Sequence, residues 1–154
     1  ALRRAERDGA DIVVYMVDCD STRVDDWRSK VGEIAAVGAY AKRQVSIIAC
    51  VPMSMSECWL MSDHDAWLGL GLSDTSKLPA HPERLWGDKH DPGSHYPKNV
   101  FAKVCVEAGL SDSVETRNLV MSQTRSERLA AACNNSFPRF RDDIQAAIVR
   151  QTEA

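Results

Sequence analysis

The sequence predicts an α/β fold in which a parallel sheet is flanked by helices and followed by a helical C-terminal part. Two short apolar runs rich in β-branched residues, at 12–20 and 44–51, are separated by a stretch with helical periodicity. A strand, a helix and a second strand in this order form a crossover that places the two strands parallel. From residue 98 to residue 154 the chain shows mainly helical patterns. We expect one domain spanning residues 1–154, because this length and a hydrophobic content of 44% suffice for one core.

The first strand is expected at residues 12–20, where an apolar run ends in two aspartates, Asp18 and Asp20. Alternate residues of a strand point to the same side, so both carboxylates can face one point at the strand's carboxyl end, where α/β sheets bind ligands. Mg²⁺ favours one or two carboxylates, with water and phosphate oxygens in its remaining positions. The alternative is that Asp18, Asp20 and the following Ser21 only mark a turn. The pattern leaves both interpretations open.

The connection between the strands is predicted to be an amphipathic helix. Residues 22–41 place apolar side chains at helical spacing among charged ones, and Ser21 is a candidate N-cap. Residues 44–51 form the second predicted strand, which Pro52 ends.

Glu57 has two competing interpretations. Residues 53–70 read as a helix that is interrupted near Ser62-Asp63, and Ser54 with Glu57 matches the capping-box pattern at its start. Glu57 also follows the second strand directly, which in a parallel sheet places it at the same edge as the aspartates. It is therefore either a helix cap or a third acidic group of a metal site.

Residues 71–97 are predicted to form a long irregular loop over a site, because they are rich in Gly, Pro, His and Asp. The histidines of this loop (His81, His90, His95), with Asp88 and Asp91, invite a zinc or histidine-nuclease interpretation, but the paired cysteine ligands common in structural zinc sites are absent. A polar loop with His-Pro and Asp-Pro turns is favoured. The sequence contains no P-loop, dinucleotide-binding fingerprint or Gly-x-Ser-x-Gly elbow, so it does not support those nucleotide-binding and hydrolase classes.

The C-terminal part, residues 98–154, is predicted to be helical. Thr124 and Glu127 match a second capping box, and the segment 113–121 is ambiguous between strand and helix. The helices expected here cover residues 97–109, 124–133 and 136–150.

Composition limits the class of protein. The net charge of −3 argues against a protein that coats nucleic acid by bulk electrostatics. Five cysteines without a Cys-x-x-Cys pair favour reduced thiols, and hence a cytoplasmic protein. No apolar stretch approaches the roughly 18 residues that span a bilayer, so we expect no membrane insertion.

Several short blocks, taken in order, resemble a known group of proteins. The strand ending in Asp18-Cys19-Asp20 is similar to the metal-binding strand of Toprim-like domains, which occur in topoisomerases, primases and nucleases of the overcoming-lysogenization-defect type. Further blocks resemble a poorly characterised bacterial Toprim-like family found with antiphage and mobile-element genes, often beside an ABC-type ATPase; they lie at residues 57–63, 96–98, 125–127 and 136–140. The resemblance implies a Toprim/Rossmann-like parallel sheet.

The resemblance also implies a function. Asp18, Asp20 and Glu57 would be catalytic and would bind Mg²⁺ or Mn²⁺, and Lys98 would contact a phosphate. The expected activity is phosphodiester cleavage of nucleic acid by a nuclease or nuclease subunit of an antiviral defence system. DNA binding is expected, and the pattern leaves open whether the substrate is DNA or RNA. The expected protein partner is an ABC-type ATPase, and an oligomeric assembly is left open.

One departure from the Toprim pattern supports rival functions. Toprim domains carry a glutamate on a strand before the Asp-x-Asp strand, but no strand pattern precedes Ile12, and Glu6 lies in a helical stretch. We therefore expect that the domain lacks its N-terminal strand, with the glutamate either upstream of Ala1 or absent. The second hypothesis is a catalytically incomplete module that binds a partner ATPase or nucleic acid. A third, a hydrolase of small phosphorylated metabolites, would need a closed pocket.

Overall fold

The computed structural model describes residues 2–41 and 45–153 and contains a parallel β1–β2 sheet. Strand β1 (Ile12–Met16) pairs with β2 (Ser46–Cys50) in a register that sets Ile12 opposite Ser46. Helix α2 (Val24–Ala36) connects them. The predicted strand–helix–strand unit and the mixed α/β class are confirmed, although Gln44 of the second predicted strand lies outside the described residues.

The remaining elements are mostly helical. The C-terminal part is helical as predicted, and the ambiguous segment 113–121 lies largely in helix α6. These elements are α1 (Leu2–Arg7), the 3-10 turn η1 (Val37–Tyr40), α3 (Glu57–Leu60), α4 (His64–Gly69), η2 (Thr75–Lys77), η3 (Pro82–Arg84), α5 (Pro97–Glu107), α6 (Val114–Gln123), α7 (Ser126–Ala132) and α8 (Phe137–Thr152).

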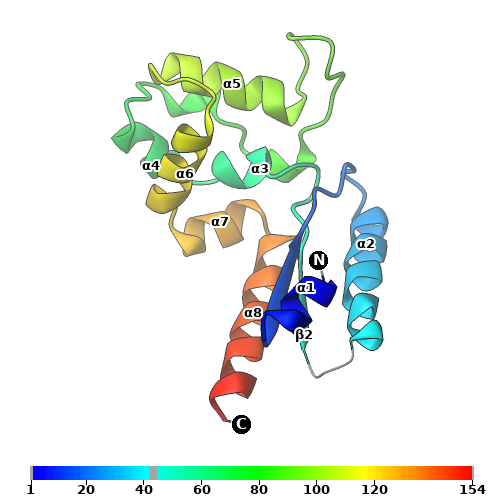
Figure 1. Cartoon of the computed structure of the whole chain (residues 1–154). Helices are drawn as coiled ribbons and strands as arrows, with labels where there is room; N and C mark the ends of the chain where they lie inside the picture. The colour runs from blue at the N-terminus through cyan, green and yellow to red at the C-terminus, as the bar shows by residue number, and fades with distance from the viewer. Residues whose placement is uncertain (1, 42–44, 154) are drawn as a thin grey trace.

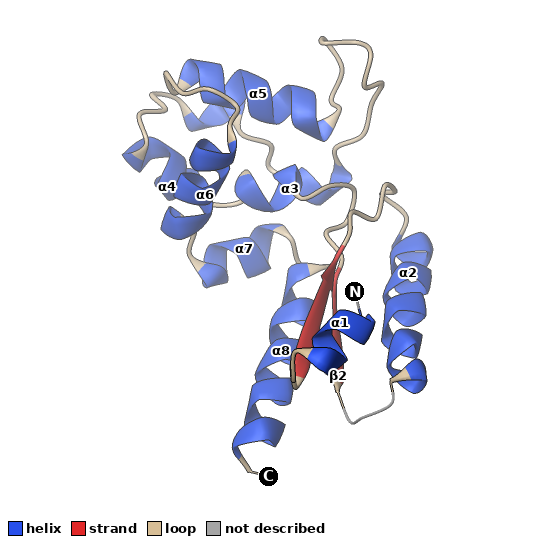
Figure 2. Cartoon of the chain, viewed as in Figure 1, coloured by secondary structure: helices blue, strands red, loops and turns tan. Residues whose placement is uncertain are grey.

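The sheet lies between α2 and α8, as Figures 1 and 2 show. Trp27 of α2 packs in one cluster with Ala49 and Val51, and its indole N–H donates a hydrogen bond of 2.8 Å to the Val51 carbonyl. Cys50 belongs to another cluster that includes Phe140 of α8. Because neighbouring strand residues point to opposite sides, this alternation buries the two faces of β2 under different helices.

Helices α3 to α7 gather beyond the carboxyl ends of the strands (Figure 1). Their core contains Trp67 and Phe101, whose rings meet edge to face with centroids 5.8 Å apart. The Trp67 indole N–H donates to the Leu60 carbonyl at 2.8 Å, across the break between α3 and α4. The predicted interruption near Ser62-Asp63 is therefore confirmed.

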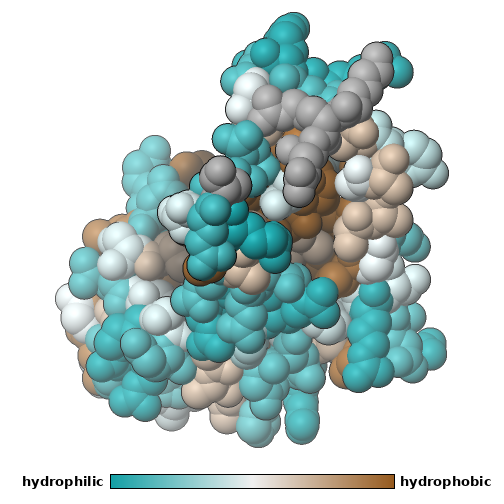
Figure 3. Space-filling model, turned by 90° about the horizontal axis from the view of Figure 1, so that it is seen from below, coloured by the Kyte–Doolittle hydropathy of each residue, from teal (hydrophilic) through white to brown (hydrophobic). Residues whose placement is uncertain are grey.

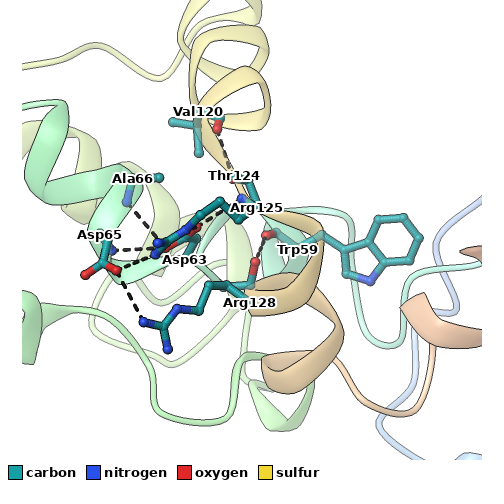
Figure 4. Close-up of polar contacts among 9 residues, drawn as sticks. Trp59, Asp63, Asp65, Ala66, Val120, Thr124, Arg125 and Arg128 are labelled. Carbon is teal, nitrogen blue, oxygen red and sulfur yellow. Dashed lines mark hydrogen bonds and ion pairs between the residues drawn. The ribbon is translucent and has the colours of Figure 1, made fainter.

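An ion-pair network ties α4 to α7 (Figure 4). Asp63 is buried, N-caps α4 by accepting from the N–H of Asp65 and Ala66, and also accepts from the backbone and guanidinium of Arg125. Burial acts to raise the pKa of Asp63, but the hydrogen bonds from Arg125 and the backbone outweigh it and lower the pKa to about 2. Asp65 accepts from Arg125 and, at 3.4 Å, from Arg128.

Three predicted helix starts are wrong in detail. Ser21 lies two residues before the N-cap of α2, Arg23, and binds the N–H of that residue. Ser54 is buried and donates to the Leu85 carbonyl at 2.9 Å, so it does not cap α3. Thr124 likewise donates back to a carbonyl of α6, and α7 begins after Arg125 without a side-chain cap. In each case the hydroxyl binds another backbone group.

The loop at 71–97 is less irregular than predicted, because buried side chains fix it to the rest of the molecule. Leu72, Leu78 and Leu85 enter the core beside Trp67. Glu83 is buried and accepts hydrogen bonds from the backbone N–H groups of Asn135 and Ser136 and from the Ser136 hydroxyl, at the start of α8.

Part of the sheet remains uncovered. Met16 of β1 is 61% exposed and Val14 is 44% exposed. Seen from below, the molecule shows hydrophobic side chains in a hollow bordered by hydrophilic ones (Figure 3).

Within the described ranges, none of the helices combines the length and apolar character needed to cross a membrane.

Candidate functional site

The candidate site is built on two chain segments that stay paired beyond the regular strands. The N–H of Cys19 donates to the Pro52 carbonyl at 3.0 Å, and the N–H of Asp20 donates to the Ser54 carbonyl at 2.9 Å. The prediction that the first strand continues regularly to Asp20 is wrong, since β1 ends at Met16. Pro52 has no N–H for a ladder, and Asp20 and Ser54 adopt left-handed φ angles of 55° and 61°.

Asp18 stands at the centre of this edge. It is half-buried, and one of its carboxylate oxygens accepts a 2.8 Å hydrogen bond from the Ser56 N–H. Burial raises the pKa of Asp18 above its ordinary value, and the negative charges of Glu57 and Asp20 raise it further against the opposing Ser56 bond. The backbone brings the three groups to the same edge, because Ser56, whose N–H binds Asp18, precedes Glu57 directly, and the N–H of Asp20 binds the Ser54 carbonyl two residues earlier.

Glu57 is the most deeply buried member. It begins α3, its exposed fraction is 1%, and its Oε1 accepts a 2.6 Å hydrogen bond from Arg117. The other oxygen, Oε2, is buried and has no hydrogen-bond partner within the described part of the chain. A buried carboxylate oxygen without a partner is costly, so an explanation is required for this one.

Arg117 neutralises only part of this charge. Its guanidinium also binds Asp112, through Nη2 at 2.8 Å and Nε at 3.0 Å, and stands 5.0 Å from the centre of the Phe101 ring. One positive charge therefore faces two carboxylates. The guanidinium bonds Oε1 of Glu57 and leaves Oε2 without a partner.

A second cation lies near Asp18 but does not bind its carboxylate. Lys30 of α2 donates to the backbone carbonyls of Asp18 at 2.9 Å and of Cys19 at 3.2 Å. This lysine fixes the chain at the end of the first segment and leaves the acidic side chains available for another positive partner.

The fit to Mg²⁺ or Mn²⁺ is partial. Across residues 2–41 and 45–153, no group of three or more His, Cys, Asp or Glu side chains is arranged to hold a metal ion. Mg²⁺ usually takes only one or two protein carboxylates and completes its shell with water and phosphate oxygens. Asp18 and the free oxygen of Glu57 fit that smaller requirement in charge and chemistry. Asp20 is exposed, and its own backbone has the left-handed φ angle.

The described contacts do not bring the other predicted site residues to this edge. Lys98 is exposed in the first turn of α5, and the described contacts do not join it to Asp18, Asp20 or Glu57. The histidines of the 71–97 loop are exposed. Their surroundings form ordinary turns, in which Asp88 accepts from the His90 N–H at 2.8 Å.

Sequence reasoning missed Arg117, Ser56 and Lys30. Arg117 and Glu57 are 60 residues apart in the sequence, so no local pattern predicts that they pair. Lys30 could have been found, because it lies two turns into the helix that follows the strand and a long side chain there can reach back to the strand's end.

A second depression lies beside the Asp63–Arg125 network. It is an open cleft of about 500 Å³ whose lining includes His64, Asp65, Thr75 and Arg128. The aspartates and arginines in and under this cleft pair with one another (Figure 4), so it presents no uncompensated charge. The edge at Asp18 and Glu57 is the better candidate.

Comparison with known proteins gives no relative: no protein-family model, curated protein or solved structure matches this chain.

Proposed function

We propose that this chain is a Mg²⁺-dependent, phosphodiester-cleaving nuclease or the nuclease subunit of a larger assembly. The observation that carries the proposal is the free, buried Oε2 of Glu57, the residue directly after Ser56, whose N–H binds the Asp18 carboxylate. These carboxylates lie at the carboxyl ends of parallel strands, where α/β sheets bind their ligands. A divalent cation bound between them would reduce their mutual repulsion.

The roles of the residues follow from their surroundings. Asp18 and Glu57 would hold the cation, the exposed Asp20 would lie beside them, and Arg117 would orient Glu57 through the 2.6 Å bond. When bound, the metal would lower the pKa of an attacking water and neutralise charge on the phosphate. Lys98 would contact a phosphate of the nucleic acid from α5, since it is exposed and in the helix's first turn.

The biological setting is part of the proposal and depends on the family resemblance described above. It comprises a Toprim/Rossmann-like fold, a cytoplasmic location, a role in bacterial antiphage defence and an ABC-type ATPase as partner. The parallel strand–helix–strand unit supports the fold assignment.

A second function, a catalytically incomplete Toprim-like module, is supported by a specific observation. The described residues offer no ready group of three metal ligands, and Glu57 already has a cationic partner in Arg117. Such a module would bind the ATPase or nucleic acid without cleaving it.

The experiment that separates the two is a cleavage assay on labelled single-stranded and duplex DNA and RNA with Mg²⁺, Mn²⁺ or EDTA, with and without the ATPase. We expect metal-dependent cleavage that Asp18→Asn abolishes. Binding without cleavage under every condition would favour the incomplete module. Cleavage by a folded Asp18→Asn protein at the wild-type rate would refute the proposed mechanism.

A further inference from the structure

Trp86 differs from the other tryptophans of the chain. Trp27, Trp59 and Trp67 are buried, whereas Trp86 is 49% exposed. A single exposed apolar side chain is ordinary on a protein surface. What sets Trp86 apart is the way in which the chain on both of its sides is held.

Both neighbours of Trp86 are fixed. Leu85 is buried in the core, and its carbonyl accepts the 2.9 Å hydrogen bond from the Ser54 hydroxyl. On the other side, a Cβ added to Gly87 would lie 2.8 Å from the Tyr96 backbone nitrogen and 2.9 Å from the Ser94 side chain. Only glycine fits this close approach of two chain segments. The indole is therefore presented at the closed base of the loop 87–96.

The contacts of Leu85, the residue before Trp86, lead to the candidate metal site. Ser54, which holds Leu85, also accepts the N–H of Asp20 at its carbonyl oxygen, at 2.9 Å. Two hydrogen bonds thus connect the residue before Trp86 to Asp20. In Figure 1 the loop between η3 and α5 lies at the end of the molecule toward which the strands point.

The charge of this loop suits a polyanion. Residues 84–98 contain three basic residues (Arg84, Lys89, Lys98) and two acidic ones (Asp88, Asp91), a local charge of +1 in a chain of net charge −3. The three basic residues are exposed. The carboxylates of Asp88 and Asp91 each accept a backbone N–H within the loop, so they serve its turns.

We infer that Trp86 is a stacking platform for an unpaired base of single-stranded nucleic acid, with Lys89 and Lys98 as its phosphate contacts. Lys89 lies two residues after Gly87, and Lys98 lies two residues after Tyr96, so both follow the segments that meet beside Trp86. Aromatic side chains on which bases stack, together with basic residues for the backbone, are the means by which proteins bind single strands without reading sequence, and a duplex hides the base faces that stacking needs. The inference rests on the proposed function, because it names the substrate class of the same acidic edge.

The test measures binding without metal, so that it does not depend on cleavage. Labelled dT and rU 20-mers, and the dT strand annealed to its complement, are titrated in EDTA and followed by anisotropy, while tryptophan emission of the wild type is recorded. We expect single strands to quench the emission of Trp86 saturably and to bind at least about fivefold more tightly than the duplex. Trp86→Ala should weaken single-strand binding by at least about fivefold, and Trp86→Phe by less.

Charge variants provide a matched comparison. Lys89→Gln and Lys98→Gln should weaken binding and reduce its dependence on salt, whereas Lys77→Gln, an exposed lysine on η2, should do neither. Equal affinity for duplex and single strand, no binding, or unchanged affinity in Trp86→Ala would overturn the inference. Metal-dependent cleavage that Trp86→Ala leaves intact would reject stacking while retaining the nuclease. Single-strand binding that depends on Trp86, without any cleavage, would retain stacking and reject the nuclease.

Discussion

Removing the Arg125 guanidinium should destabilise the protein and change how its stability depends on pH. Asp63 is buried and receives bonds from the guanidinium at 3.0 and 3.1 Å. The fall in its pKa from 3.8 to about 2 corresponds to about 2 kcal/mol of stabilisation. Loss of one partner of a fully buried pair costs about 3–5 kcal/mol, and Arg125 is 48% exposed, so we expect Arg125→Met to cost about 2–3 kcal/mol.

The pH dependence has a definite sign. Because the folded-state pKa of Asp63 is depressed, the stabilisation is fully present above about pH 4 and is lost as the pH falls from about 4 to about 2. Urea denaturation at pH 7 and pH 3 should show a smaller pH effect in Arg125→Met than in wild type. Arg128→Met removes only the exposed 3.4 Å contact to Asp65 and should change the free energy of unfolding by less than about 0.5 kcal/mol. A loss below about 1 kcal/mol in Arg125→Met, or one equal to that in Arg128→Met, would refute this reasoning.

Two further predictions concern buried or half-buried carboxylates. Asp18→Asn should leave the free energy of unfolding at pH 7 unchanged or increase it, because burial and Glu57 disfavour the ionised Asp18 while asparagine still accepts the Ser56 N–H; a clear loss in thermal denaturation would contradict this. Glu83→Gln should lower stability by about 2 kcal/mol, because a neutral amide replaces the anion that accepts two backbone N–H groups and the Ser136 hydroxyl at the start of α8. Urea denaturation checks it, and a change within about 0.5 kcal/mol would show that the charge does not matter.

The elements that sequence analysis predicted well are those encoded locally. The two apolar runs and the helix between them fix a parallel pair, and this topology brings the residues after the second strand, Ser56 and Glu57, to the edge that carries Asp18. The capping boxes failed because tertiary partners took the side chains: Ser54 binds a carbonyl 31 residues away, and Glu57 binds an arginine 60 residues away. A short polar pattern indicates which groups can bond but not which partner the fold will bring.

The geometry of the aspartates could not be predicted for a related reason. Alternation along a strand holds only while the backbone remains extended. Asp20 adopts a left-handed backbone conformation, and so does Ser54, the residue whose carbonyl accepts the Asp20 N–H. The spacing of the two aspartates does not predict that turn. The half-burial of Asp18 beside an exposed Asp20 follows from the paired turn, not from the sequence pattern.

Calorimetric titration with Mg²⁺ and Mn²⁺ tests most directly whether Asp18 and the free oxygen of Glu57 bind a divalent cation. We expect one saturable site in wild type and at least tenfold weaker binding in Glu57→Gln, which corresponds to about 1.4 kcal/mol. Asp112→Asn, which removes the other carboxylate on Arg117, is the matched control and should retain the site. Absence of saturable binding in wild type, or identical titrations for wild type and Glu57→Gln, would contradict the account.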